Sequence, residues 1–135
     1  QSSPRYDDVV AEVAQYLQRA ADQALQAGLA PDRICLDPGL GFGKTLEHNV
    51  ALLRHLPTLT DLGYPVLIGA SRKTMVGKLS GVDQPRDRLH GSVGAAVAAA
   101  MRGAAVVRVH DVKANRQAAD VAWAIAKFPA GITTP

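Results

Sequence analysis

The sequence has few of the features that mark secreted, membrane-spanning or nucleic-acid-binding proteins. Its 135 residues include one cysteine, so no disulfide can form within the chain, and a reducing compartment fits. No apolar run approaches the roughly 20 residues that a membrane-spanning helix needs, and Gln1 begins no signal-peptide pattern. The 15 lysines and arginines exceed the 12 acids by too little to suggest a nucleic-acid partner. We therefore expect a soluble, cytoplasmic protein with neither a membrane nor a nucleic acid as its partner.

What the sequence has in quantity is apolar side chains, which make up 47% of the residues and give a chain of this length enough material for a core. We expect residues 1–135 to form a single domain, because no linker or low-complexity segment interrupts them. The cysteine, Cys35, stands between Ile34 and Leu36, and a thiol in such a run is predicted to be a small buried hydrophobe.

The spacing of apolar residues predicts one helix followed by three strand-loop-helix units. The first helix, residues 8–27 before Gly28, is carried by residues three or four apart: Val9, Val13, Leu17, Ala20 and Ala24. The predicted strands are short apolar runs at residues 33–36, 65–69 and 105–109. The helices after them are predicted at residues 46–56, where Pro57 ends the helix, then up to residue 103 with a break at Ser80-Gly81, and finally at residues 113–127.

Strands that are this continuously apolar are typical of sheets covered on both faces, and their alternation with helices predicts parallel pairing. The predicted fold class is therefore α/β. Three strands cannot close a barrel, and an open sheet leaves two apolar edges. Three arrangements remain open: a small three-layer sheet, the second half of an eight-stranded barrel, and an assembly in which sheet edges pair between copies.

The stretch LDPGLGFGKT, residues 36–45, nearly matches a phosphate-binding loop, because it ends in Gly43-Lys44-Thr45. That loop needs a glycine five positions before Gly43, where this chain has Pro38, which carries no N–H donor. We interpret the stretch instead as a strand end and a ligand loop, whose glycines, Gly41 among them, let the backbone pass close to a flat ligand. Lys44 then has no ligand role and only precedes the next predicted helix.

Polar side chains follow each predicted strand, at the edge of the sheet where parallel α/β folds bind ligands. They are Asp37 after the first strand, Ser71, Arg72 and Lys73 after the second, and Arg108, His110 and Asp111 at the third. Arg108 and His110 can offer charge-assisted hydrogen bonds to a phosphate or pyrophosphate. The Asp37 carboxylate suits a planar heterocycle with two adjacent N–H donors, and Lys73 can donate to an acceptor on that ring. Singly, each residue has a structural explanation, such as a turn for Asp37; their convergence favours a ligand site.

Other polar and aromatic residues have simpler interpretations. No metal site is predicted, because the histidines have no ligand spacing: His48, His55, His90 and His110. His48 and His55 are expected to have no special role. The small residues of segment 91–100 are expected to allow close helix packing, and Trp123 to anchor the core or an interface.

Three motifs occur in the order and spacing of the dihydropteroate synthase family: LDPGLGFGK at 36–44, GASRKTMVG at 69–77 and RVHDV at 108–112. Over nearly all of its length, the chain resembles the carboxyl-terminal half of this family. The resemblance implies a (β/α)8 TIM barrel, of which the chain would form strands six to eight and helices five to eight. It also implies a transferase of folate biosynthesis that joins p-aminobenzoate to the methylene carbon of a pterin diphosphate and releases pyrophosphate. A homodimer and inhibition by sulfonamides are further expectations from the resemblance.

The resemblance assigns roles to individual residues. Asp37 and Lys73 would bind the pterin, Arg108 and His110 the pyrophosphate, and Ser71, with Phe42 near it, would border the p-aminobenzoate pocket. Lys73, Arg108 and His110 are the expected catalytic residues, and Gly41 and Arg72 are further expected substrate contacts. The family's asparagine ligand for Mg²⁺ comes from preceding strands, so Mg²⁺ would be bound with the diphosphate through ligands outside this chain. The chain alone is therefore expected to have negligible synthase activity.

Two other interpretations stay open. The nearest enzyme rival is the pterin-binding domain of a pterin-dependent methyltransferase, which shares the barrel. Ser71-Arg72-Lys73 with the Arg108-x-His110 pair favours the synthase. From a different class, the chain could be a noncatalytic half-barrel that associates with itself.

Overall fold

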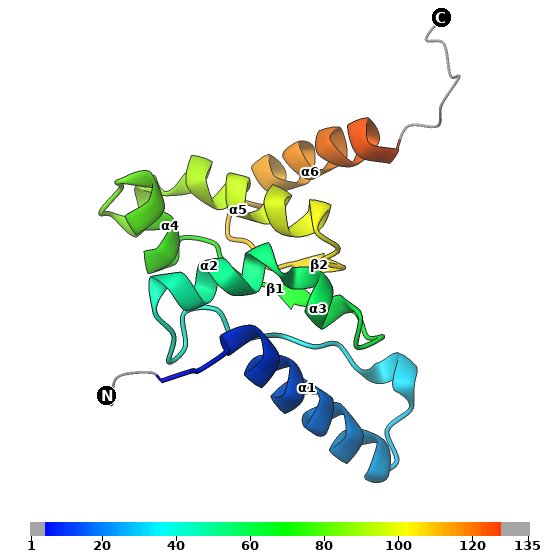
Figure 1. The fold of residues 1–135 in the computed structure, drawn as a ribbon. Helices are drawn as coiled ribbons and strands as arrows, with labels where there is room; N and C mark the ends of the chain where they lie inside the picture. The colour runs from blue at the N-terminus through cyan, green and yellow to red at the C-terminus, as the bar shows by residue number, and fades with distance from the viewer. Residues whose placement is uncertain (1–4, 128–135) are drawn as a thin grey trace, which may run out of the picture.

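The computed structural model describes residues 5–127, which begin with a long helix (Figure 1). This helix, α1 (Val9–Gln26), starts after Asp8, whose carboxylate accepts a hydrogen bond from the Ala11 N–H at 3.1 Å. Its buried residues are Val9, Val13, Ala14, Leu17 and Ala21. The predicted helix is confirmed, but Ala20 is exposed and Ala21 is buried in its place, because a four-residue step from Leu17 continues the inner face.

The remaining elements alternate between helices and short strands. After a turn at Pro31–Arg33 they follow in the order α2 (Leu46–Arg54), α3 (Leu56–Thr60), β1 (Leu67–Ile68), α4 (Thr74–Ser80), α5 (Leu89–Met101), β2 (Val106–Val107) and α6 (Val112–Lys127). A second short turn, Pro85–Asp87, joins α4 to α5. The predicted break at Ser80-Gly81 is confirmed, since Gly81 ends α4 with a φ of 73°, a left-handed conformation that suits glycine.

The second helical segment differs from the prediction at its two ends. Pro57 does not end a helix; it lies in the first turn of α3, where its missing N–H costs no hydrogen bond. The start of α2 depends on a reciprocal pair: Thr45 Oγ1 accepts from the His48 N–H, and His48 Nδ1 accepts from the Thr45 N–H, both at 3.1 Å. The expectation that His48 has no special role is therefore wrong, because its ring caps this helix.

The sheet is parallel but smaller than predicted. Leu67 of β1 pairs with Val106 of β2, and Ile68 pairs with Val107. The predicted strand at 33–36 is reduced to a single parallel bridge between Leu36 and Val66, because residues 31–33 form a turn whose first carbonyl accepts the Ile34 N–H. The parallel pairing expected from the alternation with helices is thus present, in strands that are only two residues long.

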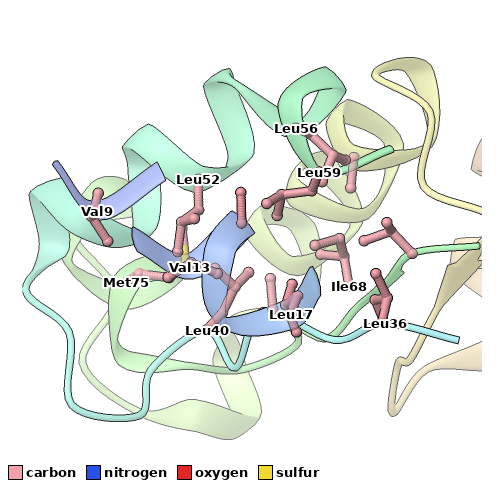
Figure 2. Packing of buried hydrophobic residues seen from close by; sticks show 14 of the residues in the cluster. Val9, Val13, Leu17, Leu36, Leu40, Leu52, Leu56, Leu59, Ile68 and Met75 are labelled. Carbon is pink, nitrogen blue, oxygen red and sulfur yellow. The ribbon is translucent and has the colours of Figure 1, made fainter. Parts of the chain in front are cut away.

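The core lies between one face of this sheet and the helices (Figure 2). Val66 and Ile68 are at most 1% exposed, and from the helices Leu52, Leu56 and Leu59 are fully buried beside them. The opposite face of the sheet is open: Val106 is 44% exposed and Cys35 is also exposed. The predictions that both faces are covered and that Cys35 is buried are therefore wrong, because alternate residues of a strand point to opposite faces.

Helix α6 packs on α5 and leaves much of its apolar surface uncovered (Figure 1). Trp123 is 55% exposed, so within residues 5–127 it does not anchor a core. None of the helices in the described range is long and apolar enough to cross a bilayer.

Candidate functional site

Residues from the ends of all three predicted strands lie against one another. Arg108 Nη1 lies 3.6 Å from Asp37 Oδ2, and the two side chains remain partly exposed. Ser71 and His110 make two contacts: the Ser71 hydroxyl lies 2.9 Å from His110 Nδ1, and it accepts the His110 N–H at 3.2 Å. One edge of the sheet therefore presents a carboxylate, an arginine, an imidazole and a hydroxyl together. We call these four residues the rim.

The loop after Leu36 is held by side chains rather than by a regular element. Asp37 Oδ1 accepts the Gly39 N–H at 2.9 Å, which closes a tight turn past Pro38. Lys44 Nζ donates to the carbonyl oxygens of Gly39 at 2.9 Å and Phe42 at 3.1 Å. The interpretation of Lys44 as a mere approach to the next helix is therefore too weak, because its ammonium closes the loop. Burial lowers the pKa of Lys44, and the nearby Asp37 carboxylate partly opposes this.

The buried amide of Asn49 fixes the same loop from below. Asn49 is 4% exposed, and its Oδ1 accepts the Gly41 N–H at 3.0 Å. Gly41 has a φ of 83°, and a Cβ added there would lie 3.4 Å from Lys73 Cδ. Glycine at position 41 therefore allows a left-handed backbone and leaves space for the aliphatic part of the Lys73 side chain.

Lys73 connects the loop to the end of β1. Its Nζ donates to the Leu40 carbonyl at 2.6 Å and lies 5.2 Å from the centre of the Phe42 ring, close enough for a cation–π contact. Burial, and next the charge of Arg108, lower the pKa of Lys73, whereas Asp37 raises it. The lysine is therefore a partly desolvated cation placed beside the rim.

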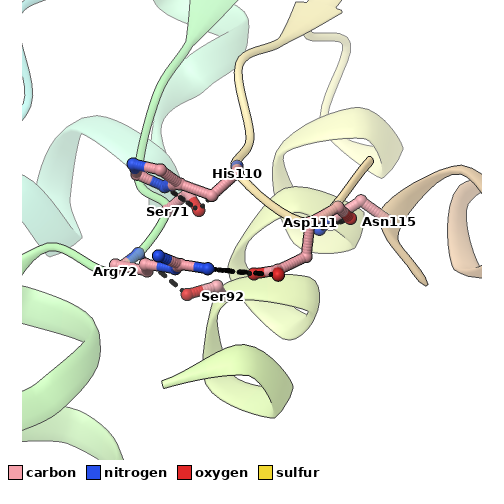
Figure 3. A network of polar contacts seen from close by, with 6 residues as sticks. All are labelled: Ser71, Arg72, Ser92, His110, Asp111 and Asn115. Carbon is pink, nitrogen blue, oxygen red and sulfur yellow. Dashed lines mark hydrogen bonds and ion pairs between the residues drawn. The ribbon is translucent and has the colours of Figure 1, made fainter. Parts of the chain in front are cut away.

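Arg72 points away from the rim toward the start of α6 (Figure 3). Its Nη2 forms an ion pair with Asp111 at 3.2 Å, and Asp111 in turn accepts the Asn115 side-chain N–H through its carbonyl at 2.8 Å. The Arg72 N–H donates to Ser92 Oγ at 2.9 Å. The helix of small residues therefore does more than pack closely, since the hydroxyl of Ser92 binds the loop after β1.

A cavity of about 550 Å³ opens between the glycine loop, α4 and the Pro85–Asp87 turn. Its cationic lining is unusually dense: Lys44, Arg72, Lys73, Lys78 and Arg88. Phe42, 70% exposed, forms an aromatic part of the wall. Lys73 lines this cavity, and the charges of Asp37 and Arg108 shift its pKa, so it lies between the cavity and the rim. Such a cavity suits a flat ligand with a negative charge at one end.

No group of three histidine, cysteine, aspartate or glutamate side chains within residues 5–127 is arranged to hold a metal ion. The Mg²⁺ expected with a diphosphate would therefore need ligands from other residues or from the diphosphate itself.

Sequence reasoning missed Asn49, Ser92 and Arg88 as parts of the site. For the first two a signal was present, because each is a polar residue on an otherwise apolar helical stripe. Asn49 stands with Leu52 on the buried face of α2, and Ser92 with Ala96 on that of α5. A buried polar side chain needs a partner, and in both cases the partner is a backbone N–H of the site loops.

Comparison with known proteins agrees with the motifs. The profile of the family described as "Pterin binding enzyme" matches residues 1–110. The chain is 58% identical over 119 residues to the dihydropteroate synthase of Neisseria meningitidis serogroup C, a match that covers 87% of this chain and 42% of that protein.

Solved dihydropteroate synthases have the same arrangement of elements. The Thermus thermophilus protein in complex with 4-aminobenzoate has a TM-score of 0.88 at 52% identity, over 92% of this chain and 48% of that chain. The Xanthomonas albilineans protein in complex with 7,8-dihydropteroate has a TM-score of 0.92 at 48% identity, over 96% and 49%. The chain spans less than half the length of these relatives. The resemblance seen in the motifs is confirmed, and this chain belongs to the family of pterin-binding enzymes.

Proposed function

We propose that this chain works as part of a dihydropteroate synthase, a transferase that joins p-aminobenzoate to a pterin diphosphate and releases pyrophosphate. One observation carries the proposal: an acid, a lysine and an arginine-histidine pair converge at one edge of the sheet, beside a cationic cavity. Relatives that are 52% and 48% identical to this chain over the matched residues were solved with 4-aminobenzoate and with 7,8-dihydropteroate.

The pterin ring would bind at the rim, between Asp37 and Lys73. Asp37 Oδ1 holds the Gly39 N–H and Oδ2 faces Arg108, yet each carboxylate oxygen keeps a free lone pair. The two oxygens can accept the amino group and the adjacent ring N–H of a pterin in one plane. The Lys73 ammonium would leave the Leu40 carbonyl and donate to the ring's carbonyl oxygen and a nitrogen.

The diphosphate would bind to Arg108 and His110. Because the Ser71 hydroxyl accepts the His110 N–H, it can give its own hydrogen to His110 Nδ1. The ring proton then resides on Nε2, which is free to donate to a phosphate oxygen. Ser71 thereby orients His110, and because it directly precedes the cavity residues Arg72 and Lys73, it would also border the p-aminobenzoate pocket.

The cavity would hold p-aminobenzoate, with the ring near Phe42 and the carboxylate among the cations of the lining. The amine nitrogen forms a bond to the methylene carbon of the pterin, and the carbon–oxygen bond to the diphosphate breaks, with its electron pair leaving on pyrophosphate. The nitrogen then loses its proton to water. Arg108 and His110 stabilise the charge that develops on the leaving group, so catalysis is mainly electrostatic and positional. Sulfonamides, which resemble the amine substrate, would compete for this cavity.

The open face of the sheet supports the finer architecture we propose, namely half of a (β/α)8 barrel. Val106 and Cys35 lie on the face that a closed barrel would turn inward, while Ile68 and Val66 pack on the helices. The exposed apolar residues of α6 support a homodimer: Val112, Val121, Trp123 and Ile125. Mg²⁺ bound with the diphosphate, and a cytoplasmic location, stay predictions.

Calorimetry on the full-length protein tests the assignment. Titration with the pterin diphosphate and Mg²⁺ should give saturable binding that Lys73→Ala weakens strongly. Arg116→Ala is the matched control, because Arg116 is an exposed cation on α6 whose ion pair with Asp120 lies away from the rim. An affinity unchanged by Lys73→Ala would contradict the role of Lys73, and no binding by the wild-type protein would contradict the proposed function.

A further inference from the structure

Arg72 has an unusual backbone for its residue type. Its φ of 59° makes it the non-glycine residue with a left-handed conformation among residues 5–127. Such a conformation is unfavourable for a side chain with a Cβ, and it persists only where surrounding contacts enforce it. Arg72 stands between Ser71 and Lys73, whose side chains face the rim and the cavity. Whatever holds Arg72 therefore also sets the directions of its two neighbours.

Three contacts hold Arg72, at its N–H, its guanidinium and its carbonyl, and Figure 3 shows the first two. Ser92 Oγ accepts its N–H at 2.9 Å, and Asp111 binds its guanidinium at 3.2 Å. The third contact comes from Arg88, whose Nη1 donates to the Arg72 carbonyl at 2.8 Å. Because a peptide carbonyl moves with the torsion angles on either side, this last bond acts directly on the link between residues 72 and 73.

The guanidinium of Arg88 is itself fixed at all three nitrogens. Besides Nη1, its Nε donates to the Val82 carbonyl at 2.9 Å, and its Nη2 donates to the Asp83 carbonyl. A planar guanidinium has donors in a rigid fork, so three carbonyl acceptors leave it little freedom. Arg88 thereby ties the segment after α4 to the loop after β1.

Gly77 provides the space in which Arg88 lies. A Cβ added to Gly77 would lie 2.5, 2.6 and 2.7 Å from Nε, Cζ and Nη2 of Arg88, which is too close for any of them. Gly77 has an ordinary helical backbone in α4, and alanine is more favourable than glycine inside a helix. Glycine at this position is thus explained by the guanidinium that packs on it rather than by backbone conformation.

We propose that Arg88 is a positioning residue for the site: lying on Gly77, it holds the Arg72 carbonyl so that Ser71 and Lys73 face the substrates. This inference rests on the proposed synthase function. It predicts that the effect of Gly77→Ala on substrate binding depends on whether Arg88 is present. Gly77→Ala should displace the guanidinium and harm substrate binding when Arg88 is present, but should add little harm in an Arg88→Ala background, where the three atoms nearest to the added methyl group are gone.

The test compares the full-length wild-type protein with Arg88→Ala, Gly77→Ala and the double variant, by calorimetry with the pterin diphosphate and Mg²⁺. Arg88→Ala and Gly77→Ala should each raise the Kd on the order of 10- to 100-fold, the scale expected when binding groups are displaced by about an ångström. The double variant should bind no worse than Arg88→Ala. Loss of stability alone would lower the fraction of molecules that bind but leave their Kd unchanged, so the Kd separates positioning from folding.

Two control variants match the substitutions. Arg86→Ala removes an exposed arginine two residues before Arg88, and Gly94→Ala adds a methyl group to a helical glycine of α5 with no atom within 4 Å of the added carbon. Both should keep the wild-type Kd. Wild-type affinity in Arg88→Ala, or an equal cost of Gly77→Ala with and without Arg88, would overturn the inference while leaving the synthase assignment intact. Failure of the wild-type protein to bind the pterin would instead overturn the assignment itself.

Discussion

The ion pair between Asp37 and Arg108 predicts that one substitution acts differently on two related ligands. In the proposed site Arg108 binds the diphosphate and Asp37 binds the pterin ring, and Arg108 Nη1 also lies 3.6 Å from Asp37 Oδ2. Arg108→Met should therefore weaken binding of the pterin diphosphate. It should not weaken binding of the same pterin without its diphosphate, because that ligand loses no contact and meets an Asp37 freed from its partner.

The structure sets the size of both effects. The side chains of Arg108 and Asp37 are 58% and 39% exposed, and a pair this exposed is worth at most about 1 kcal/mol. Release of Asp37 should thus tighten binding of the diphosphate-free pterin by at most about fivefold. A hydrogen bond between arginine and a charged phosphate contributes about 1.5–3 kcal/mol, so the diphosphate ligand should lose roughly 10- to 150-fold in affinity.

Calorimetry with both ligands on the full-length protein measures the two effects directly. Arg116→Met is the matched control, because it removes the same side chain from an exposed pair with Asp120 at 3.1 Å on α6. It should change neither affinity. An equal loss of affinity for both ligands in Arg108→Met would refute the reasoning, since it would mean that Arg108 supports the ring site rather than the diphosphate.

Three further predictions concern the loop, the lysine and the exposed helix. Asn49→Ala should lower the free energy of unfolding by about 1 kcal/mol, because the Gly41 N–H loses its acceptor; urea denaturation measures this, and a midpoint equal to that of the surface control Gln15→Ala would contradict it. Because the pKa of Lys73 is lowered in the folded chain, the unfolded chain binds more protons between that lowered pKa and 10.5, and stability gains from Lys73 as the pH rises through this window. Urea unfolding at a series of pH values should show a larger gain in the wild type than in Lys73→Met, which keeps the contribution of Lys44, and parallel curves would contradict it. Ile125→Ser on α6 should shift the sedimenting mass of the full-length protein from dimer to monomer, whereas a monomeric wild type would exclude the proposed dimer.

The elements that sequence predicts well are those with a strong local cause. Helix α1 follows from apolar residues at helical spacing and a capping aspartate, and the end of α4 follows from Gly81. Asp37 and Arg108 lie on either side of β1, and their closeness follows from a single rule, that the strands of one parallel sheet end at the same edge. Each of these depends on residues close together in the chain or on a property of all parallel sheets.

What sequence could not give depends on contacts between distant residues. A three-residue apolar run around Cys35 does not say whether one or both faces of its strand are covered, because that depends on which other segments are packed there. Arg88 contacts both Gly77 and the Arg72 carbonyl, which lie 11 and 16 residues before it in the chain. Nothing in the local sequence DRLHGS, residues 87–92, indicates these contacts. The role of Lys44 is hidden for a related reason, since its hydrogen bonds run backward to the loop rather than onward to the helix.

The central claim is that this chain contributes the rim and the cavity of a dihydropteroate synthase, and turnover tests it most directly. The full-length protein should convert a pterin diphosphate and p-aminobenzoate into dihydropteroate with one pyrophosphate released per product, and Lys73→Ala should abolish most of this turnover while Arg116→Ala keeps it. If the folded wild-type protein formed no dihydropteroate, or if Lys73→Ala kept full turnover, the claim would be contradicted.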